Sequence, residues 1–422
     1  MTVLFLDPVG TLGGAERCLL DLAASMRASQ RALRMGLIVG GDGPLVAEAE
    51  RIGMEVTVLP LPRSVSRAGD SAIDGLAGVV RSFPSLLVAG AALGSYGIEL
   101  ERIIRRFRPT VIHSNGMKMH LLSALLPRYG VPVIWHLRDF LGQRAIMAHV
   151  LGALSRRADG VLAISRAVAE DAARTLGRDD VRLIYDAIDT DCFVAAGERL
   201  DLDGLAGLPP PAAGTLRIGL VATYARWKGQ EVFIDSAAAY RARGGPPARF
   251  YIIGGPAYDT EDSQFSMLEL RQRIAARGLA DGFGLVPFQP EPQAAYRSLD
   301  VAVHASTRPE PFGRTIAEAM SCGRALVIAN EGGAAELVSH DHDAIAVAPR
   351  DPETLAGALV ALAADPAKRA RLGAAARITA ETRYARARIG PETLAAYAAI
   401  RGAAGSGGPP RSSQPSEGVS VR

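Results

Sequence analysis

Short apolar runs recur along the chain, and each is followed by a longer amphipathic stretch. In the first half the expected strands are 3–8, 35–40, 55–60, 110–116, 131–137, 160–165 and 181–189. Helices are expected from about residue 15 and over 44–53, 70–107, 117–128, 143–157 and 166–176. Apolar strands that alternate with helices predict a doubly wound parallel α/β sheet, with helices on both faces.

The alternation breaks at 195–214, a stretch with prolines and glycines that predicts a linker, and then restarts. The strands expected after the break are 216–225, 248–255, 283–288, 301–307, 325–330 and 344–347, with helices over 352–382 and 391–400. We therefore expect an N-terminal domain (1–194), a C-terminal domain (215–388), a C-terminal helix (389–402) and a disordered tail (403–422). Two such domains predict a cleft between them, where ligands preferentially bind.

Composition and charge narrow the classes of partner. A formal net charge of +3 over 422 residues gives no sign of a nucleic-acid partner. The cysteines, Cys18, Cys192 and Cys322, lack the spacing of a metal site or a disulfide framework, so a cytoplasmic location is expected. No signal peptide is visible, and the most lipid-like stretch, 84–98, is shorter than the roughly 20 residues of a membrane span.

Peripheral contact with a membrane stays open because a group of arginines follows this stretch: Arg102, Arg105, Arg106 and Arg108. Such a group is more often the solvated face of a helix.

Most of the candidate functional residues lie between residues 308 and 333. Glu310 follows an expected strand, and seven residues separate it from Glu318, in the first turns of an expected helix. Open α/β sheets bind ligands at the carboxyl ends of their strands, and helix N-termini attract phosphate. Two carboxylates around such a helix start fit a nucleotide-sugar, which carries hydroxyls and a diphosphate. The simpler alternative is a capping box of Thr315 and Glu318, which leaves Glu310 unexplained.

This pattern resembles the donor-site signature of the retaining family 4 glycosyltransferases. That signature is a glutamate, seven residues, a second glutamate and then a Gly-Gly pair, which are here Glu310, Glu318 and Gly332-Gly333. The likeness covers nearly the whole chain and implies the GT-B fold, two Rossmann-like domains that face a central cleft. It also implies that Glu318 holds the ribose hydroxyls and that Glu310, a candidate catalytic residue, holds the sugar hydroxyls. Further contacts to the sugar or the diphosphate are implied for Phe312, Gly313, Thr315, Gly332 and Gly333.

A second candidate segment follows the first strand of the C-terminal domain. Arg226 and Lys228 precede a helix start, where cations suit a diphosphate, and the chain has only three lysines. In the resembling family an arginine lies five residues before the lysine. Thr223 occupies that place here, so we expect Arg226 to substitute for it. The alternative for Arg226 is an exposed loop cation.

The N-terminal domain contributes two further candidates. Gly13-Gly14 lies between the first strand and the first helix, which by itself indicates only a turn. The resemblance implies that this pair faces the cleft and touches the donor phosphates. His136 ends the strand 131–137, and the resemblance implies a catalytic histidine there, close to the reacting sugar. His113 ends another strand and is a second candidate.

Two segments could be mistaken for metal ligands. Asp189-Thr190-Asp191 has the form of a D-x-D motif, but it resembles this family's Asn-Gly-Ile-Asp segment, with Asp186-Ala187 in place of Asn-Gly. Residues 340–343, of sequence HDHD, are expected to form a polar surface turn. We expect no metal and no other cofactor, since cations of the chain and helix dipoles can offset the diphosphate charge.

The sequence thus predicts a retaining glycosyltransferase that moves a sugar from a nucleotide diphosphate-sugar, as in polysaccharide biosynthesis. The C-terminal domain would bind the donor, and the N-terminal domain a glycan, lipid-linked or small-molecule acceptor. Two alternatives remain open. One is a nucleotide-sugar epimerase or hydrolase of the same fold, and the other is a non-catalytic nucleotide-sugar-binding protein.

Overall fold

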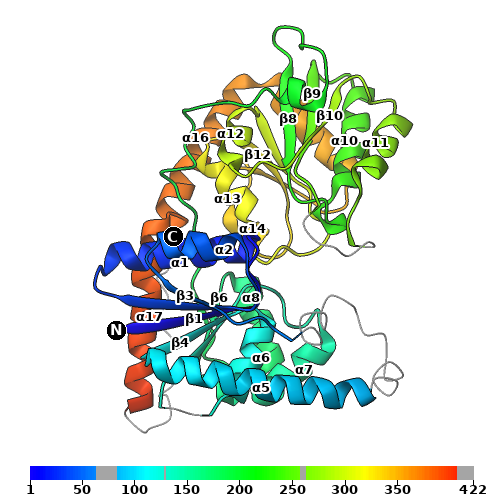
Figure 1. Ribbon diagram of the computed structural model, residues 1–422. Coiled ribbons are helices and arrows are strands. Elements are labelled where there is room, and N and C mark those ends of the chain that lie inside the picture. The colour runs from blue at the N-terminus through cyan, green and yellow to red at the C-terminus, as the bar shows by residue number, and fades with distance from the viewer. Residues whose placement is uncertain (63–82, 128–129, 257–262, 406–422) are drawn as a thin grey trace.

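The computed structural model describes residues 1–62, 83–127, 130–256 and 263–405, and contains two parallel β-sheets that lie one above the other in Figure 1. The tail that we expected to be disordered lies almost wholly outside the described residues, since it begins at 403 and the description ends at 405. The first part of the helix expected over 70–107 also lies outside them.

The first sheet has seven strands in the order β3-β2-β1-β4-β5-β6-β7, all parallel. Its strands are β1 (Thr2–Asp7), β2 (Arg34–Val39), β3 (Glu55–Val58), β4 (Val111–Asn115), β5 (Val133–Leu137), β6 (Gly160–Ala163) and β7 (Arg182–Leu183). Its helices are α1 (Gly14–Ser29), α2 (Pro44–Arg51), α5 (Phe83–Phe107), α6 (Met117–Leu125), α7 (Ala145–Leu154), the 3-10 turn η1 (Ser155–Arg157) and α8 (Arg166–Leu176). The strand order reverses between β1 and β4, where ligands of doubly wound sheets bind.

The second sheet has six strands in the order β10-β9-β8-β11-β12-β13, again all parallel. Its strands are β8 (Leu216–Val221), β9 (Ala248–Ile253), β10 (Phe283–Val286), β11 (Val301–His304), β12 (Ala325–Ala329) and β13 (Ile345–Val347). Its helices are η2 (Arg226–Lys228), α10 (Gln230–Ala242), α11 (Met267–Ala276), α12 (Pro292–Arg297), α13 (Arg314–Ser321), α14 (Ala334–Leu337), α15 (Pro352–Ala364) and α16 (Pro366–Arg383). Two doubly wound sheets of matching strand order confirm the predicted fold class.

The segment 195–214, predicted to be a linker, contains the short helix α9 (Leu202–Ala206). The side chain of Asp201 accepts a hydrogen bond from the backbone N–H of Gly204 (3.0 Å) and caps this helix. The next carboxylate, Asp203, accepts from the Tyr251 hydroxyl (2.6 Å) and from Arg217 (2.9 Å). These bonds fasten the segment to the second sheet.

The strand predicted over 181–189 is shorter than expected, because only Arg182–Leu183 pairs with the sheet. The chain then crosses toward the other domain, and the backbone N–H of Ile188 donates to the carbonyl of Tyr384 (2.9 Å). Ile188 is fully buried at that crossing. The apolar pattern there therefore reports burial against the chain near Tyr384, and the prediction of a full strand was wrong.

The last described helix, α17 (Arg386–Gly405), returns to the first domain and lies beside α1 and the first sheet in Figure 1. Tyr397 and Ile400 of this helix belong to the apolar core of that domain. A Cβ atom at Gly390 would collide with the backbone of Ser25 and Met26 in α1, so glycine permits the close approach. The helix predicted over 391–400 is therefore longer than expected and begins before Pro391.

Within the described ranges, no helix is long and apolar enough to cross a membrane. Membrane contact was left open because of a group of arginines. Two of them lie on α5 and form ion pairs with acidic neighbours on the same helix. Arg102 pairs with Glu99 (2.9 Å) and Arg105 pairs with Glu101 (2.5 Å). Such exposed pairs are typical of a solvated helix surface.

Candidate functional site

Glu310 lies in the loop between β11 and α13, and its carboxylate is 7% exposed. The ammonium of Lys228 donates to both carboxylate oxygens (2.9 Å each), and the hydroxyl of Ser306 donates to Oε2 (2.9 Å). Nε2 of His304 lies 3.2 Å from the same oxygen. Burial alone would raise the pKa of Glu310, but the charge of Lys228 and the contact with His304 hold that pKa well below its usual range. Glu310 is therefore an ionised acceptor of hydrogen bonds.

The loop that carries Glu310 rests on the glycine pair singled out in the sequence. The backbone N–H of Gly333 donates to the carbonyl of Glu310 (2.7 Å), and Gly332 has a φ of 65°. A Cβ atom at Gly333 would collide with the backbone of this loop, so only glycine permits the contact. Phe312 is buried, and its ring centroid lies 5.9 Å from that of Tyr384. Phe312 thus supports the loop by packing.

Glu318 lies inside α13, which begins at Arg314 directly after Gly313. Its carboxylate accepts hydrogen bonds from Nε of Arg314 (2.8 Å) and from the hydroxyl of Tyr296 (3.0 Å). The capping-box alternative for Thr315 and Glu318 is therefore wrong, because the carboxylate faces away from the backbone at the helix start. Burial raises the pKa of Glu318, and the bonds from Arg314 and Tyr296 offset only part of this effect.

Arg314 joins this region to the first domain. Its Nη1 lies 2.7 Å from a carboxylate oxygen of Asp21 in α1 and 3.5 Å from Sγ of Cys18. The side chain of Arg314 is only 15% exposed, and that of Asp21 only 11%. The carboxylate expected to hold the ribose, Glu318, is thus linked through one guanidinium to the other domain. The sequence did not reveal this contact, since its two residues are 293 positions apart.

The two cations expected to share a diphosphate face different partners. Nη2 of Arg226 lies 2.8 Å from Glu269 of α11, and its guanidinium lies 4.3 Å from the ring centre of Phe265. The ammonium of Lys228 lies 3.9 Å from the ring centre of Trp227, besides its bonds to Glu310. The substitution of Arg226 for the missing arginine therefore stays a prediction.

In the first domain, His136 is the next-to-last residue of β5 and is fully buried. Its Nδ1 lies 3.2 Å from Nε2 of His113 and 3.4 Å from Nη2 of Arg138. Burial lowers the pKa of His136 well below its usual range, and the positive charge of Arg138 adds to this effect. His136 is therefore a neutral imidazole, and both histidines proposed from the sequence lie side by side.

A buried polar cluster surrounds these histidines at the ends of β1, β4 and β5. Arg138 donates from Nε to Asn115 (2.6 Å) and from Nη1 to Asp186 (2.6 Å), while Asn115 donates to Asp7 (2.6 Å). Burial raises the pKa of Asp7 to about 7, and the negative charge of Glu16 adds to this effect. The sequence indicated only Asp186, as a departure from the family pattern, and missed the rest of the cluster.

The Gly13-Gly14 pair lies at the start of α1. The backbone N–H of Gly13 donates to the carboxylate of Glu16 (2.8 Å). Beside Gly14, no atom lies within 4 Å of the position that a Cβ would take. The turn therefore borders open space, as a ligand-facing loop requires.

Asp139 follows the cluster in the first domain, and its pKa is raised mainly by burial and further by the negative charge of Glu310. This effect indicates that the Glu310 loop and the chain after β5 are near enough for their charges to interact.

Neither candidate metal segment holds a cluster of ligands. Asp189 accepts a hydrogen bond from the backbone N–H of Asp191 (3.1 Å) and pairs with Arg386 (2.7 Å). In the other segment, His340 accepts from a backbone N–H (3.1 Å), and Asp343 accepts from the N–H of a nearby residue (2.7 Å). In the described part of the chain, no group of three or more His, Cys, Asp or Glu side chains is arranged to hold a metal ion.

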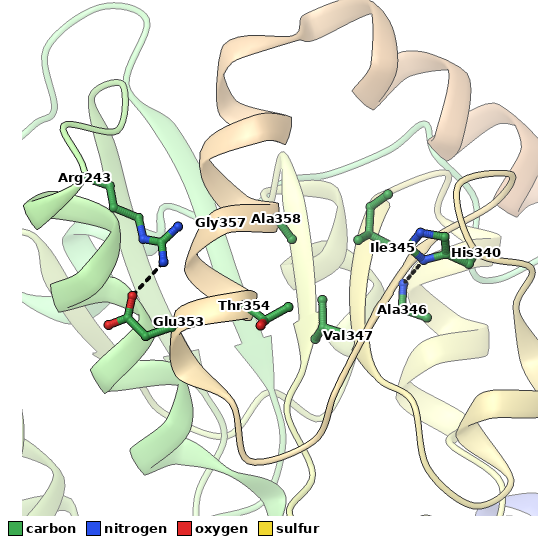
Figure 2. Close-up of a pocket in the computed structure, with 9 residues that line it drawn as sticks. All are labelled: Arg243, His340, Ile345, Ala346, Val347, Glu353, Thr354, Gly357 and Ala358. Carbon is green, nitrogen blue, oxygen red and sulfur yellow. Dashed lines mark hydrogen bonds and ion pairs between the residues drawn. The ribbon is translucent and has the colours of Figure 1, made fainter.

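A hollow of about 400 Å³ lies between α15 and β13 (Figure 2). Its polar groups pair with one another. Arg243 bonds Glu353 (2.7 Å), and His340 bonds the backbone of Ala346 (3.1 Å). None of the residues that the sequence proposed as a site lines it, so we place the candidate site between the domains instead.

Comparison with known proteins agrees with this arrangement. The profile of the family described as Glycosyltransferase Family 4 matches residues 12–192, and that of Glycosyl transferases group 1 matches residues 212–379. The chain belongs to the family 4 type of glycosyltransferases. The predicted family and GT-B fold are thereby confirmed.

Two curated relatives differ in how much of the chain they match. The D-inositol 3-phosphate glycosyltransferase of Jonesia denitrificans is 32% identical over 153 residues, which are 36% of this chain and 35% of that protein. The alpha-maltose-1-phosphate synthase of Mycolicibacterium smegmatis is 27% identical over 341 residues, 74% of this chain and 85% of that protein. The chain thus spans about a third of the first relative's length and most of the second's.

Solved structures resemble the whole described fold. The Anabaena protein Alr3699/HepE, in complex with UDP-glucose, superposes with a TM-score of 0.76 at 25% identity, covering 94% of this chain and 100% of that one. Sucrose-phosphate synthase from Thermosynechococcus elongatus gives a TM-score of 0.74 at 18% identity, covering 96% and 100%. The second likeness concerns the fold alone.

Proposed function

We propose that this protein transfers a sugar, with retention of anomeric configuration, from a nucleoside diphosphate-sugar to an acceptor. The observation that carries the proposal is the Glu310 carboxylate, ionised and oriented by Lys228, Ser306 and His304 at the end of β11. A buried anion of this kind accepts hydrogen bonds from sugar hydroxyls. The similarity to a protein solved with UDP-glucose supports a nucleotide-sugar donor.

Lys228 is proposed to bind the leaving diphosphate, and its ammonium lies 2.9 Å from Glu310, the residue proposed to hold the sugar. A fixed cation stabilises the negative charge that develops as the bond to the sugar breaks. Glu310 would hold the sugar and Glu318 the ribose, with the α13 N-terminus at the phosphates. Same-face attack by the acceptor hydroxyl, with the departing phosphate as base, suits a site without a proposed protein nucleophile.

Arg226 is proposed as the second cation for the diphosphate. Its pair with Glu269 is 39% exposed on both sides, and solvent weakens ion pairs of this kind. A diphosphate can therefore draw Arg226 away from Glu269 at small cost. With both cations engaged, we expect transfer to proceed without a metal ion and to persist in a chelator.

We propose that the acceptor, a glycan, a lipid-linked sugar or a small molecule, binds the first domain, as a step in polysaccharide biosynthesis. The Gly13-Gly14 turn and His136 would face the reacting sugar from that side. A cytoplasmic location, with peripheral membrane contact through α5, belongs to the same proposal.

The proposal is tested by presenting the protein with a panel of nucleotide-sugars. A true donor should raise the melting temperature, because it binds only the folded state. Products are then analysed with and without candidate acceptors, and the anomeric configuration is read by NMR. Sugar release or conversion without an acceptor would indicate a hydrolase or an epimerase. Binding without turnover under any acceptor would indicate a non-catalytic binding protein.

A further inference from the structure

His136 has one ring nitrogen engaged and one without a partner. Nδ1 faces His113 and Arg138, whereas Nε2 is buried and has no hydrogen-bond partner among the described residues. Buried polar atoms are nearly always paired in folded proteins. The unpaired, buried Nε2 of His136 therefore points to a ligand atom as its partner.

The tautomer of His136 follows from its neighbours. An arginine guanidinium can only donate hydrogen bonds, so Nδ1 of His136 must accept from Arg138. A neutral imidazole that accepts at Nδ1 carries its proton on Nε2. The pKa of His136 lies well below its usual range because of burial and the charge of Arg138, so the ring is neutral.

The tautomer of His113 follows from that of His136. Because Nδ1 of His136 is an acceptor, the adjacent Nε2 of His113 (3.2 Å) must donate to it. Burial lowers the pKa of His113 well below its usual range, so this ring is neutral too, and its Nδ1 accepts. The hydroxyl of Tyr397 lies 2.5 Å from that Nδ1 and is therefore the donor. All three side chains are fully buried.

We propose that Tyr397 and His113 are positioning residues that hold His136 in the Nε2–H tautomer, so that His136 donates a hydrogen bond to an oxygen of the bound sugar. In this role His136 cannot act as a general base. The inference rests on the proposed function for the identity of the ligand. The protonation pattern itself follows from the hydrogen-bond geometry together with the burial that keeps both rings neutral.

The packing around His113 keeps this relay in one orientation. Its ring centroid lies 5.0 Å from that of Phe5 on one side and 5.0 Å from that of His136, which it meets edge-on. Tyr397 comes from α17, the helix that returns from the far end of the chain. Contacts from Tyr397 to His113 and from His113 to His136 thus connect α17 to the site.

The first experiment reads the tautomers directly by long-range ¹H–¹⁵N correlation spectra of protein labelled in its histidine rings. His136→Gln identifies the His136 signals among the seven histidines of the chain. We expect a pyrrole-type Nε2 and a pyridine-type Nδ1 for both His136 and His113. A pyrrole-type Nδ1 in His136 would overturn the proposal.

The second experiment removes one oxygen, with Tyr397→Phe. We expect His136 to populate both tautomers and kcat/KM to fall about tenfold, the equivalent of one ordinary hydrogen bond. Tyr240→Phe is the matched control, since Tyr240 is also buried but donates to the carbonyl of Pro246 (2.7 Å) in the other domain. That variant should keep the wild-type tautomers and rate.

Failure of this inference is distinguishable from failure of the proposed function. The tautomers are measured without any substrate, so they test the relay even if no donor is turned over. Unchanged tautomers in Tyr397→Phe would overturn the role of Tyr397. A donor sugar that shifts the Nε2 signal of His136 supports the proposed contact, and a true donor that leaves this signal unchanged contradicts it.

Discussion

The two glutamates of the donor motif are both buried, yet they lie in different kinds of surroundings. Every partner of Glu310 belongs to the second domain, namely Lys228, Ser306 and His304. Glu318, by contrast, bonds Arg314, whose other hydrogen bonds go to the first domain. Burial raises the pKa of both, but only Glu310 receives enough opposing charge to end below its usual range.

This difference separates two tasks. The setting of Glu310 is built within one domain, so it does not depend on how the domains are oriented. The setting of Glu318 includes a contact between domains, so we expect nucleotide binding at the proposed Glu318 site to be coupled to the contact of Arg314 with Asp21 in α1. Substitutions of Glu310, Glu318 and Asp21 test whether the two settings are independent.

The largest effect is expected for Glu310→Gln. This change removes the charge proposed to hold the sugar hydroxyls and leaves Lys228 without its buried partner. We expect kcat/KM to fall about 100-fold or more, in the range found when a preorganised electrostatic group is removed. Steady-state rates with a saturating acceptor measure it, and circular dichroism checks the fold. Near wild-type kcat/KM would contradict the assignment of Glu310.

Glu318→Gln should act on binding of the nucleotide. Loss of a hydrogen bond to a charged group corresponds to about 1.5–3 kcal/mol, or about 10- to 150-fold in affinity. We expect this loss for the nucleoside diphosphate, measured by calorimetry, if its ribose hydroxyls bind Glu318 as proposed. A 2′,3′-dideoxy analogue is the control, since it should bind the wild type and Glu318→Gln equally. An equal loss for both ligands would show that Glu318 does not contact the ribose.

Asp21→Asn tests the contact between domains. Arg314 keeps Glu318 as a partner, so we expect the free energy of unfolding to fall by about 1–3 kcal/mol, with a smaller effect on kcat than Glu310→Gln. Asp281→Asn is a matched control, because its pair with Arg241 (2.9 Å) is exposed and should contribute about 0–1 kcal/mol. If the two variants lose the same stability in urea, Arg314 does not couple the domains.

The smallest effect concerns the pH dependence of stability. The folded pKa of Glu310 is lowered, so its stabilisation is present above the unfolded value of about 4.3 and is lost as pH falls through the folded pKa. The folded pKa of Glu318 is raised, so its ionisation costs stability above that pKa, and the cost disappears in acid.

The two variants should therefore differ from the wild type with opposite slopes. As the pH is lowered toward 4 and below, the stability advantage of wild type over Glu310→Gln should shrink. Relative to Glu318→Gln, the wild type should gain stability over the range just above 4. Urea titrations across this range measure both differences, and slopes of the same sign would contradict the comparison.

The fold could be predicted from the sequence because nearly every strand is an apolar run buried on both faces. The runs at 35–40 and 325–330, for example, became β2 and β12 within a residue at each end. The pattern failed after Ile184, since Ile188 is buried beside Tyr384 and not in the sheet. Periodicity reports burial, but it does not say which neighbour buries the residue.

The donor motif could be recognised because its residues lie close together in the chain. Contacts between distant positions could not be read, and they include Asp21 with Arg314 and Arg138 with Asp186. Polar side chains such as Asn115 and Asp7 carry no periodic signal, because their role depends on the strands that bring them together. The sequence named His136 and His113 separately, and only the fold shows that they touch.

The return of α17 has a consequence for the order in which the chain folds as it leaves the ribosome. Ile389, Tyr397 and Ile400 fill the core of the first domain, although they are synthesised after the whole second domain. Domains generally fold as units during synthesis. The core of the first domain therefore stays incompletely packed along α1 while the second domain forms its sheet. The first domain thus cannot complete its core before the second domain has been synthesised.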